Sequence, residues 1–141
     1  MILLGDFNAN IGQEYIIHPT IGQFSLHETS TSNGLRLIDF VAARNMVIAS
    51  TIFKHLNIHK TTWMSPDQRT RNQIDYTVID GRHCSSVLDV RTFRGVNIES
   101  DHYIVADKIR MRLKVGPTTQ RKLDVSKLNS QQNLGNKFVR N

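Results

Sequence analysis

The fold is decided by a stretch near the start of the chain, Ile2-Leu3-Leu4-Gly5-Asp6-Phe7-Asn8-Ala9. Three apolar residues before a glycine are too few for a helix and are typical of a strand buried on both faces. Side chains two apart on a strand point to the same side. We therefore expect Asp6 and Asn8 to face one pocket while Phe7 packs away from it. This pair suits metal-assisted or general-base chemistry. The alternative is an Asx turn that only closes the strand.

The composition is that of one soluble globular domain. The chain has 141 residues, of which 39% are hydrophobic and 21% charged, enough to bury a core. The single cysteine, Cys84, excludes an internal disulfide and fits a reducing compartment, and it is more typical of a small buried group than of a nucleophile. No apolar run approaches a membrane span and no leader precedes the first strand. We expect an intracellular protein.

The positive charge is concentrated near the C-terminus. Up to Tyr103 there are nine Lys or Arg against ten Asp or Glu, a balance of −1, whereas residues 104–141 have nine against two, a balance of +7. Such a segment commonly contacts polyanions, although a solvated strand face and a soluble tail explain it almost as well. Within it, Ile109, Met111, Leu113 and Val115 alternate with Lys108, Arg110, Arg112 and Lys114. This alternation predicts a half-buried strand with a basic outer face.

Between these ends, the sequence predicts a long loop over residues 11–31, with a short strand around Gln23–Leu26. A helix of about three turns follows. Its apolar face is predicted from the helical spacing of Leu35, Ile38, Val41 and Ala42. Ser32 or Asn33 is expected to cap its start and Asn45 to close its end. The helix leads into the apolar run 46–49, and a buried strand followed by a helix and a strand indicates α/β layering.

Further strands are predicted at 61–64, 73–79 and 91–93, from their β-branched and aromatic residues. The first two resemble a hairpin whose tip carries Arg69 and Arg71. Polar clusters lie at the strand ends: Asp6/Asn8, Thr62/Trp63, Asp75 and Asp101/His102. Each has an ordinary explanation when taken alone. Asp75 could pair with an arginine, Asp101 and His102 could be a surface pair, and Trp63 is interpreted as a core residue.

Taken in order, these motifs are more specific. GDFN at 5–8, NGLRLIDF at 33–40, TTWMSPDQRTRNQIDY at 61–76 and SDH at 100–102 together resemble the endonuclease/exonuclease/phosphatase superfamily. They look closest to the endonuclease domains of non-LTR retrotransposons and to host proteins similar to craniofacial development protein 2. The resemblance covers roughly Met1 to Leu113. It implies an α/β fold, the C-terminal half of a two-sheet α/β sandwich (DNase I-like) with mostly antiparallel strands. Residues 1–115 would form this partial domain and 116–141 a polar basic tail or linker.

The resemblance also implies metal-dependent hydrolysis of a phosphodiester in DNA, with Mg²⁺ or Mn²⁺ as cofactor, in the nucleus. Asp6 matches the carboxylate that orients or deprotonates water, and Asn8 the amide that positions water and phosphate. His102 matches the donor to the phosphate oxygen, with Asp75 fixing its tautomer. Asp101, together with Asp6, matches the metal carboxylates. DNA contacts are expected at Arg69, Arg71, Lys108, Arg110, Arg112 and Lys114.

The chain departs from the family pattern in one respect. In the family, the motif like Asp6/Asn8 lies in the middle of the domain, after the principal metal-binding glutamate. Glu14, Glu28 and Glu99 match no such motif. We therefore expect a fragment that is inactive by itself and has an N-terminal half or a downstream reverse transcriptase region as partner. The alternatives are a non-catalytic remnant that binds nucleic acid or protein, and a phosphatase of the same superfamily.

Overall fold

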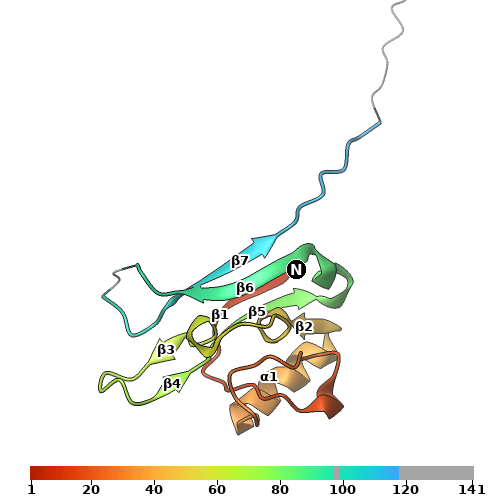
Figure 1. Cartoon of the computed structure of the whole chain (residues 1–141). Helices are drawn as coiled ribbons and strands as arrows, with labels where there is room; N and C mark the ends of the chain where they lie inside the picture. Colours follow the sequence, from red (N-terminus) through yellow and green to blue (C-terminus); the bar gives the residue numbers. More distant parts are fainter. Residues whose placement is uncertain (97–98, 118–141) are drawn as a thin grey trace, which may run out of the picture. The chain divides into compact units, whose positions relative to one another are not determined.

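The computed structural model describes residues 1–96 and 99–117. The chain divides into two units, Met1–Met111 and Arg112–Asn141, and all the described helices and strands belong to the first (Figure 1). This unit is mixed α/β, with antiparallel strands in small sheets and few helices, in agreement with the predicted fold class at this level. Among the described residues, no helix has the length and apolar character that crossing a membrane requires.

The main sheet has three antiparallel strands in the order β1-β5-β2. They are β1 (Ile2–Asp6), β5 (Asp75–Asp80) and β2 (Met46–Ile48). The central strand β5 is buried because it has a neighbour on each edge and apolar clusters on both faces. The register between β1 and β5 pairs Asp6 with Asp75. Two carboxylates far apart in the sequence thus meet at one end of the sheet.

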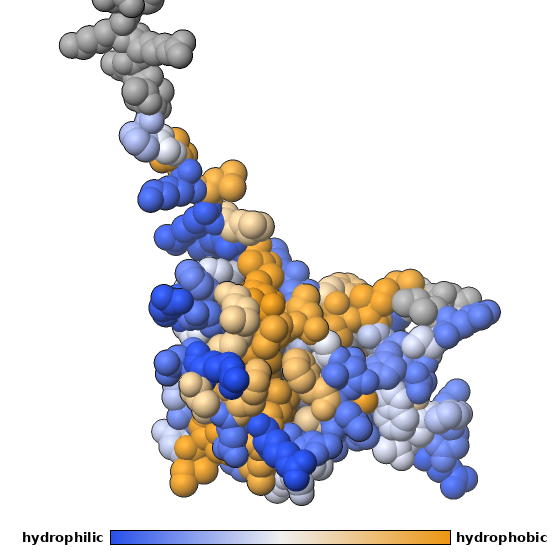
Figure 2. Space-filling view, turned by 180° about the vertical axis from the view of Figure 1, so that it is seen from behind, coloured by the Kyte–Doolittle hydropathy of each residue, from blue (hydrophilic) through white to orange (hydrophobic). Residues whose placement is uncertain are grey.

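The prediction that β1 is buried on both faces is wrong. In the described structure β1 pairs only with β5, and Leu4 is 65% exposed. Leu3 alone of the apolar run packs against the main core. The view from behind in Figure 2 shows apolar side chains gathered on the exposed surface of this unit. An apolar run therefore gives the strand, whereas its burial depends on neighbours that the described residues do not provide.

The helix α1 (Ser32–Ala43) confirms the predicted helix. Thr31, rather than Ser32 or Asn33, is the N-cap, and its side chain accepts a hydrogen bond from the Gly34 N–H. The buried stripe is Gly34, Leu37, Ile38 and Val41, the i, i+3, i+4, i+7 face, while Leu35 and Ala42 are exposed. Asn45 follows the helix with φ 53°, a conformation that asparagine tolerates at a helix end.

The loop over residues 11–31 contains a short 3₁₀ helix, η1 (Tyr15–Ile17), and no strand at Gln23–Leu26. Side-chain hydrogen bonds hold this segment in place of the backbone hydrogen bonds of the predicted strand. The Ser25 hydroxyl donates to the Ile11 carbonyl, and the Leu26 N–H donates to Oε1 of Gln73 at 2.9 Å. Ile11 and Ile21 are fully buried, so the loop is part of the core.

The predicted hairpin has a different second strand. β3 (Trp63–Met64) pairs with β4 (Arg71–Asn72), not with the strand that follows. Both edges of that strand, β5, are already occupied by β1 and β2. Two short 3₁₀ helices, η2 (Ala49–Thr51) and η3 (Asn57–His59), connect β2 to this hairpin.

The last two strands, β6 (Val87–Phe93) and β7 (Ile104–Ile109), form a separate antiparallel sheet after the 3₁₀ helix η4 (Gly81–Ser86). The predicted strand over 108–115 is wrong beyond Ile109. Met111, Leu113 and Val115 are 82–87% exposed. The strand ends there because its partner β6 begins at Val87, which lies opposite Ile109. The last backbone hydrogen bond between the two segments runs from the Arg110 N–H to the Ser86 carbonyl.

Cys84 lies half-buried in η4 and packs against a second core cluster that includes Ile79, Val87 and Val90. Burial raises the pKa of its thiol. A thiol whose pKa is raised is a poor nucleophile at neutral pH, which agrees with the structural interpretation of this residue.

Candidate functional site

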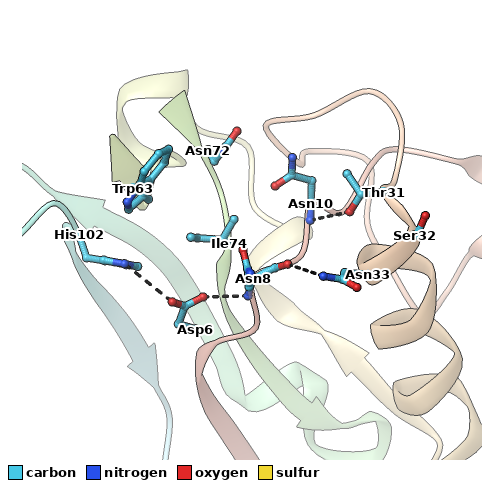
Figure 3. A pocket seen from close by; sticks show the side chains of 10 residues that line it. All are labelled: Asp6, Asn8, Asn10, Thr31, Ser32, Asn33, Trp63, Asn72, Ile74 and His102. Carbon is cyan, nitrogen blue, oxygen red and sulfur yellow. Dashed lines mark hydrogen bonds and ion pairs between the residues drawn. The ribbon is translucent and has the colours of Figure 1, made fainter. Parts of the chain in front are cut away.

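A pocket of about 680 Å³ opens where β1, β3, β4 and the start of α1 meet (Figure 3). One wall carries ionisable groups, Asp6 and His102, next to Trp63. The other wall is neutral and polar. The full lining is Asp6, Asn8, Asn10, Thr31, Ser32, Asn33, Trp63, Asn72, Ile74 and His102. The pocket thus includes three of the predicted site residues, Asp6, Asn8 and His102.

His102 and Asp75 form a hydrogen-bonded pair, with Nδ1 of His102 3.0 Å from Oδ2 of Asp75. An ionised carboxylate can only accept, so Nδ1 carries the proton in the neutral imidazole. Nε2 then points to Oδ2 of Asp6, 3.8 Å away. The side chain of Asp75 is only 18% exposed and that of His102 32%. The geometry expected of these residues, contact at the sheet end that carries Asp6, is therefore present.

Asp6 has two different surroundings for its two oxygens. Oδ1 accepts the backbone N–H of Asn8 at 2.8 Å, which is the Asx turn considered as the alternative. Oδ2 faces His102. Asn8 itself has φ 46°, and its carbonyl accepts from Nδ2 of Asn33 at 3.2 Å. Phe7 packs against the main core, as predicted. The turn and the pocket-facing carboxylate are thus compatible, because the turn fixes the direction of the carboxylate.

Asp101 is anchored by a residue that the sequence analysis assigned to the core. Nε1 of Trp63 donates to Oδ2 of Asp101 at 2.7 Å, and Oδ1 of Asp101 lies 4.0 Å from Nε2 of His102. Trp63 is half-buried and lines the pocket, so its assignment to the core is wrong. His102 Nε2 consequently faces two carboxylates across gaps longer than a hydrogen bond.

Thr62 connects the two segments that supply the His102–Asp75 pair, the start of β5 and the residues before β7. Its side chain is buried, and Oγ1 accepts the N–H groups of Ile74 at 3.0 Å and Asp75 at 3.2 Å. Its carbonyl accepts the N–H of Tyr103 at 2.8 Å. Thr62 and Trp63 were predicted as a polar cluster at a strand end, with no role for Thr62. Its position directly before Trp63 was the only signal available.

The groups that could hold a metal ion are Asp6, Asp75 and His102, whose ligand atoms lie within 4.8 Å of one another. Asp101, the predicted metal carboxylate, is outside this group. Mg²⁺ prefers oxygen ligands and is often bound by one or two carboxylates with water and substrate phosphate. Oδ2 of Asp6, which lies beside His102 Nε2 in the pocket, fits this requirement, whereas Asp101 is close to His102 but does not join the group. Asp75 fits it less well because His102 occupies its Oδ2.

Glu14 has a structural role away from this pocket. Its carboxylate accepts the N–H of Ser30 at 2.6 Å and the Ser30 hydroxyl at 3.0 Å. Burial tends to raise the pKa of this carboxyl, but the hydrogen bonds from Ser30 outweigh it and the pKa is lowered. This agrees with the absence of a metal-binding motif around Glu14.

The predicted nucleic-acid contacts all lie outside the pocket. Arg69 and Arg71 are exposed on the β3–β4 hairpin, and Lys108 and Arg110 are exposed at the end of β7. Arg112 and Lys114 are exposed in the second unit. Among the described residues, neither lysine nor arginine lines the pocket. A bound phosphate would therefore meet one carboxylate, Asp6, together with His102 and neutral groups there, but no lysine or arginine.

Comparison with known proteins finds homologues for most of the chain. The chain is 40% identical over 121 residues to Craniofacial development protein 2 of Tragulus javanicus, covering 86% of the chain and 21% of that protein. It is 37% identical over 126 residues to the protein of the same name from Bos taurus, covering 89% and 21%. The chain thus spans about a fifth of the length of these relatives. No protein-family model and no solved structure matches the chain.

Proposed function

We propose that the chain carries part of a metal-dependent phosphodiesterase site that acts on DNA. The observation that carries this proposal is the orientation of His102. Its Nδ1 is bonded to Asp75, which leaves Nε2 directed at Asp6 inside the pocket. A carboxylate–imidazole pair facing a second carboxylate is an arrangement suited to general acid–base chemistry.

Each side chain has a distinct task in this proposal. Oδ2 of Asp6 accepts a proton from the attacking water or orients it, and Asn8 helps to position water and phosphate. In its imidazolium form, His102 donates from Nε2 to a phosphate oxygen, while Asp75 accepts the proton of Nδ1. A divalent cation bound by Asp6, with water and substrate phosphate as further ligands, would supply positive charge for the phosphate. Loss of one well-placed donor in such a site costs about 10²–10³ in rate.

The exposed cations support a polyanionic substrate. Arg69 and Arg71 project from the hairpin, and Lys108 and Arg110 from the end of β7. DNA presents closely spaced phosphates that such side chains neutralise. A small lipid or inositol phosphate bound in the pocket would not contact these cations, because they lie outside the pocket lining. They therefore do not support the phosphatase alternative.

We also propose that the unit is half of a DNase I-like sandwich. The open edge of β1 and its exposed apolar side chains, Ile2 and Leu4, are what a second sheet would cover. The described residues offer the metal few carboxylates. A segment outside Met1–Asn141 would therefore complete both the sheet packing and the metal ligands.

The test is a chimera in which this chain replaces the matching stretch of the Bos taurus relative. We expect it to nick supercoiled DNA with Mg²⁺ or Mn²⁺, and we expect His102→Ala to lower the rate by about 10²–10³. His83→Ala is the control, because His83 is exposed on η4, outside the pocket lining. A folded chimera that binds DNA without nicking it would refute the proposal and favour the non-catalytic alternative.

A further inference from the structure

We propose that the neutral wall of the pocket is a nucleoside subsite, which takes the unpaired nucleotide next to the cleaved phosphate. This inference rests on the proposed function, because it concerns the same pocket. It names what the site recognises besides the phosphate. Four features of the pocket support it: the free carboxamides, the aromatic side chain, the charge and the size.

The first feature is a set of carboxamides without partners. The side chains of Asn10 and Asn72 both line the pocket (Figure 3). Neither side chain hydrogen-bonds to any described residue, since only their backbone groups do. A carboxamide carries two donors and one acceptor oxygen, and asparagine pairs well with the donor and acceptor edge of a base. Free carboxamides facing a pocket therefore suit a base edge better than a phosphate.

The second feature is Trp63, which lies on the side of the pocket next to His102 (Figure 3). Its indole N–H is bonded to Asp101, so the ring is held in one orientation instead of turning freely. An aromatic ring fixed in this way can stack on a base without losing further rotational freedom. Such stacking contributes about 1–3 kcal/mol per base and accepts every base.

The third feature is charge. Asp6 is the only acidic residue of the lining, and neither lysine nor arginine is present in it among the described residues. A phosphate alone would be repelled unless a cation accompanied it. The wall formed by Asn10, Asn72 and Ser32 is uncharged and suits an uncharged group. A nucleoside provides such a group while its phosphate remains beside His102.

The fourth feature is size. The volume of about 680 Å³ is in the range of sites that enclose small organic ligands, about 300–1,000 Å³. A base can enter such a pocket only when it leaves the stack, since enzymes that enclose a base take it from single strands or flip it out of a duplex. The subsite therefore predicts a preference for an unpaired nucleotide at the cleavage position.

The experiment uses uncharged deoxynucleosides and the intact chain without metal. Trp63 is the only tryptophan, so its indole N–H gives a single resonance that reports directly on the pocket. We expect millimolar deoxynucleosides to shift this resonance with saturation and free deoxyribose to leave it unchanged. An equal shift with deoxyribose, or no saturable shift with any nucleoside, would overturn the subsite.

A double variant and a matched control test whether the two free carboxamides bind the nucleoside. Asn10→Ala combined with Asn72→Ala removes both free carboxamides and should weaken nucleoside binding about tenfold, with each lost hydrogen bond counting for about threefold to fivefold. Asn57→Ala is the matched control, because Asn57 is exposed and lies outside the lining. An unchanged indole resonance without nucleoside shows that the Trp63–Asp101 bond survives the substitution. Equal affinity of the double variant and the control would contradict the assignment.

A third measurement separates this inference from the proposed function. A short single-stranded DNA should shift the Trp63 resonance, whereas the same sequence closed into a duplex hairpin stem should not. An equal shift with the duplex would overturn the preference for unpaired nucleotides. If nucleosides fail to bind but the chimera nicks DNA, the subsite is wrong and the proposed function stands. If nucleosides bind and the chimera does not nick, only the subsite stands.

Discussion

Replacing the Thr62 hydroxyl should damage the His102–Asp75 pair from a distance. Thr62→Val keeps the shape of the side chain and removes the acceptor for the N–H groups of Ile74 and Asp75. Each buried N–H left without a partner costs about 1–3 kcal/mol. Because the two share one acceptor, we expect Thr62→Val to lower the free energy of unfolding by about 2–4 kcal/mol.

The neighbouring residue offers a matched control. Thr61 is as buried as Thr62, and its hydroxyl also makes a hydrogen bond, donating to the Asn57 carbonyl at 3.0 Å. That carbonyl still accepts from the N–H groups of Lys60 and Thr61 in Thr61→Val. The loss should therefore be about 0.5–1.5 kcal/mol, with no effect on β5.

The assay combines urea unfolding with the ring N–H resonance of His102. In the unmodified chain Nδ1–H donates to Asp75, so its proton should exchange slowly with water. We expect Thr62→Val to broaden or remove this resonance under conditions in which the chain is still folded, and Thr61→Val to retain it. If Thr62→Val lowers stability and leaves the resonance unchanged, Thr62 is a structural residue and does not position the pair.

Three further predictions concern other parts of the chain. Burial lowers the pKa of His27, whose Nε2 accepts the Gln73 N–H. Its neutral form therefore stabilises the folded state above the ordinary value of 6.5, and this contribution should be lost as the pH falls below it. Urea unfolding on both sides of that pH should show the loss, and His27→Gln should reduce it. Reversal of Lys108, Arg110, Arg112 and Lys114 to Glu should remove a salt dependence of DNA binding whose slope is about −3.6 for four phosphates. An unchanged slope would exclude these cations as the contact. The chain alone should not nick supercoiled DNA with Mg²⁺, and nicking that a chelator abolishes would contradict this.

Local chemistry was sufficient for several elements. The spacing of apolar residues located α1, and the short apolar run before Gly5 located β1. Asp6 and Asn8 line one pocket, as predicted, although β1 ends at Asp6 and a turn, not the strand period, brings Asn8 there. These features depend on neighbours within a few residues, which is the range over which helix and strand periods act.

The assembly of the candidate site was decided by tertiary structure. Asp75 begins β5, whereas His102 lies before β7 in an isolated bridge to Trp63, 27 residues further along the chain. The motif resemblance, not any local pattern, was what linked them. Trp63 is a residue type that is usually found in the core. Its indole N–H donates to Asp101, however, and the side chain lines the pocket. The exposure of Trp63 therefore depends on where the segment that carries Asp101 lies in the fold.

At both ends of the unit, a strand-like sequence pattern predicted pairing or burial that the structure does not have. The alternation after Lys108 is a strand pattern, and the residues before Asp6 are apolar, but a strand is completed and buried only by neighbouring segments. β6 begins opposite Ile109, so the alternating residues beyond it have no ladder to join. Among the described strands β1 pairs with β5 on one edge alone, so Ile2 and Leu4 remain exposed. Local sequence patterns thus indicate which segments can form strands, whereas pairing and burial depend on distant segments, because each backbone hydrogen bond and each buried face requires a second surface.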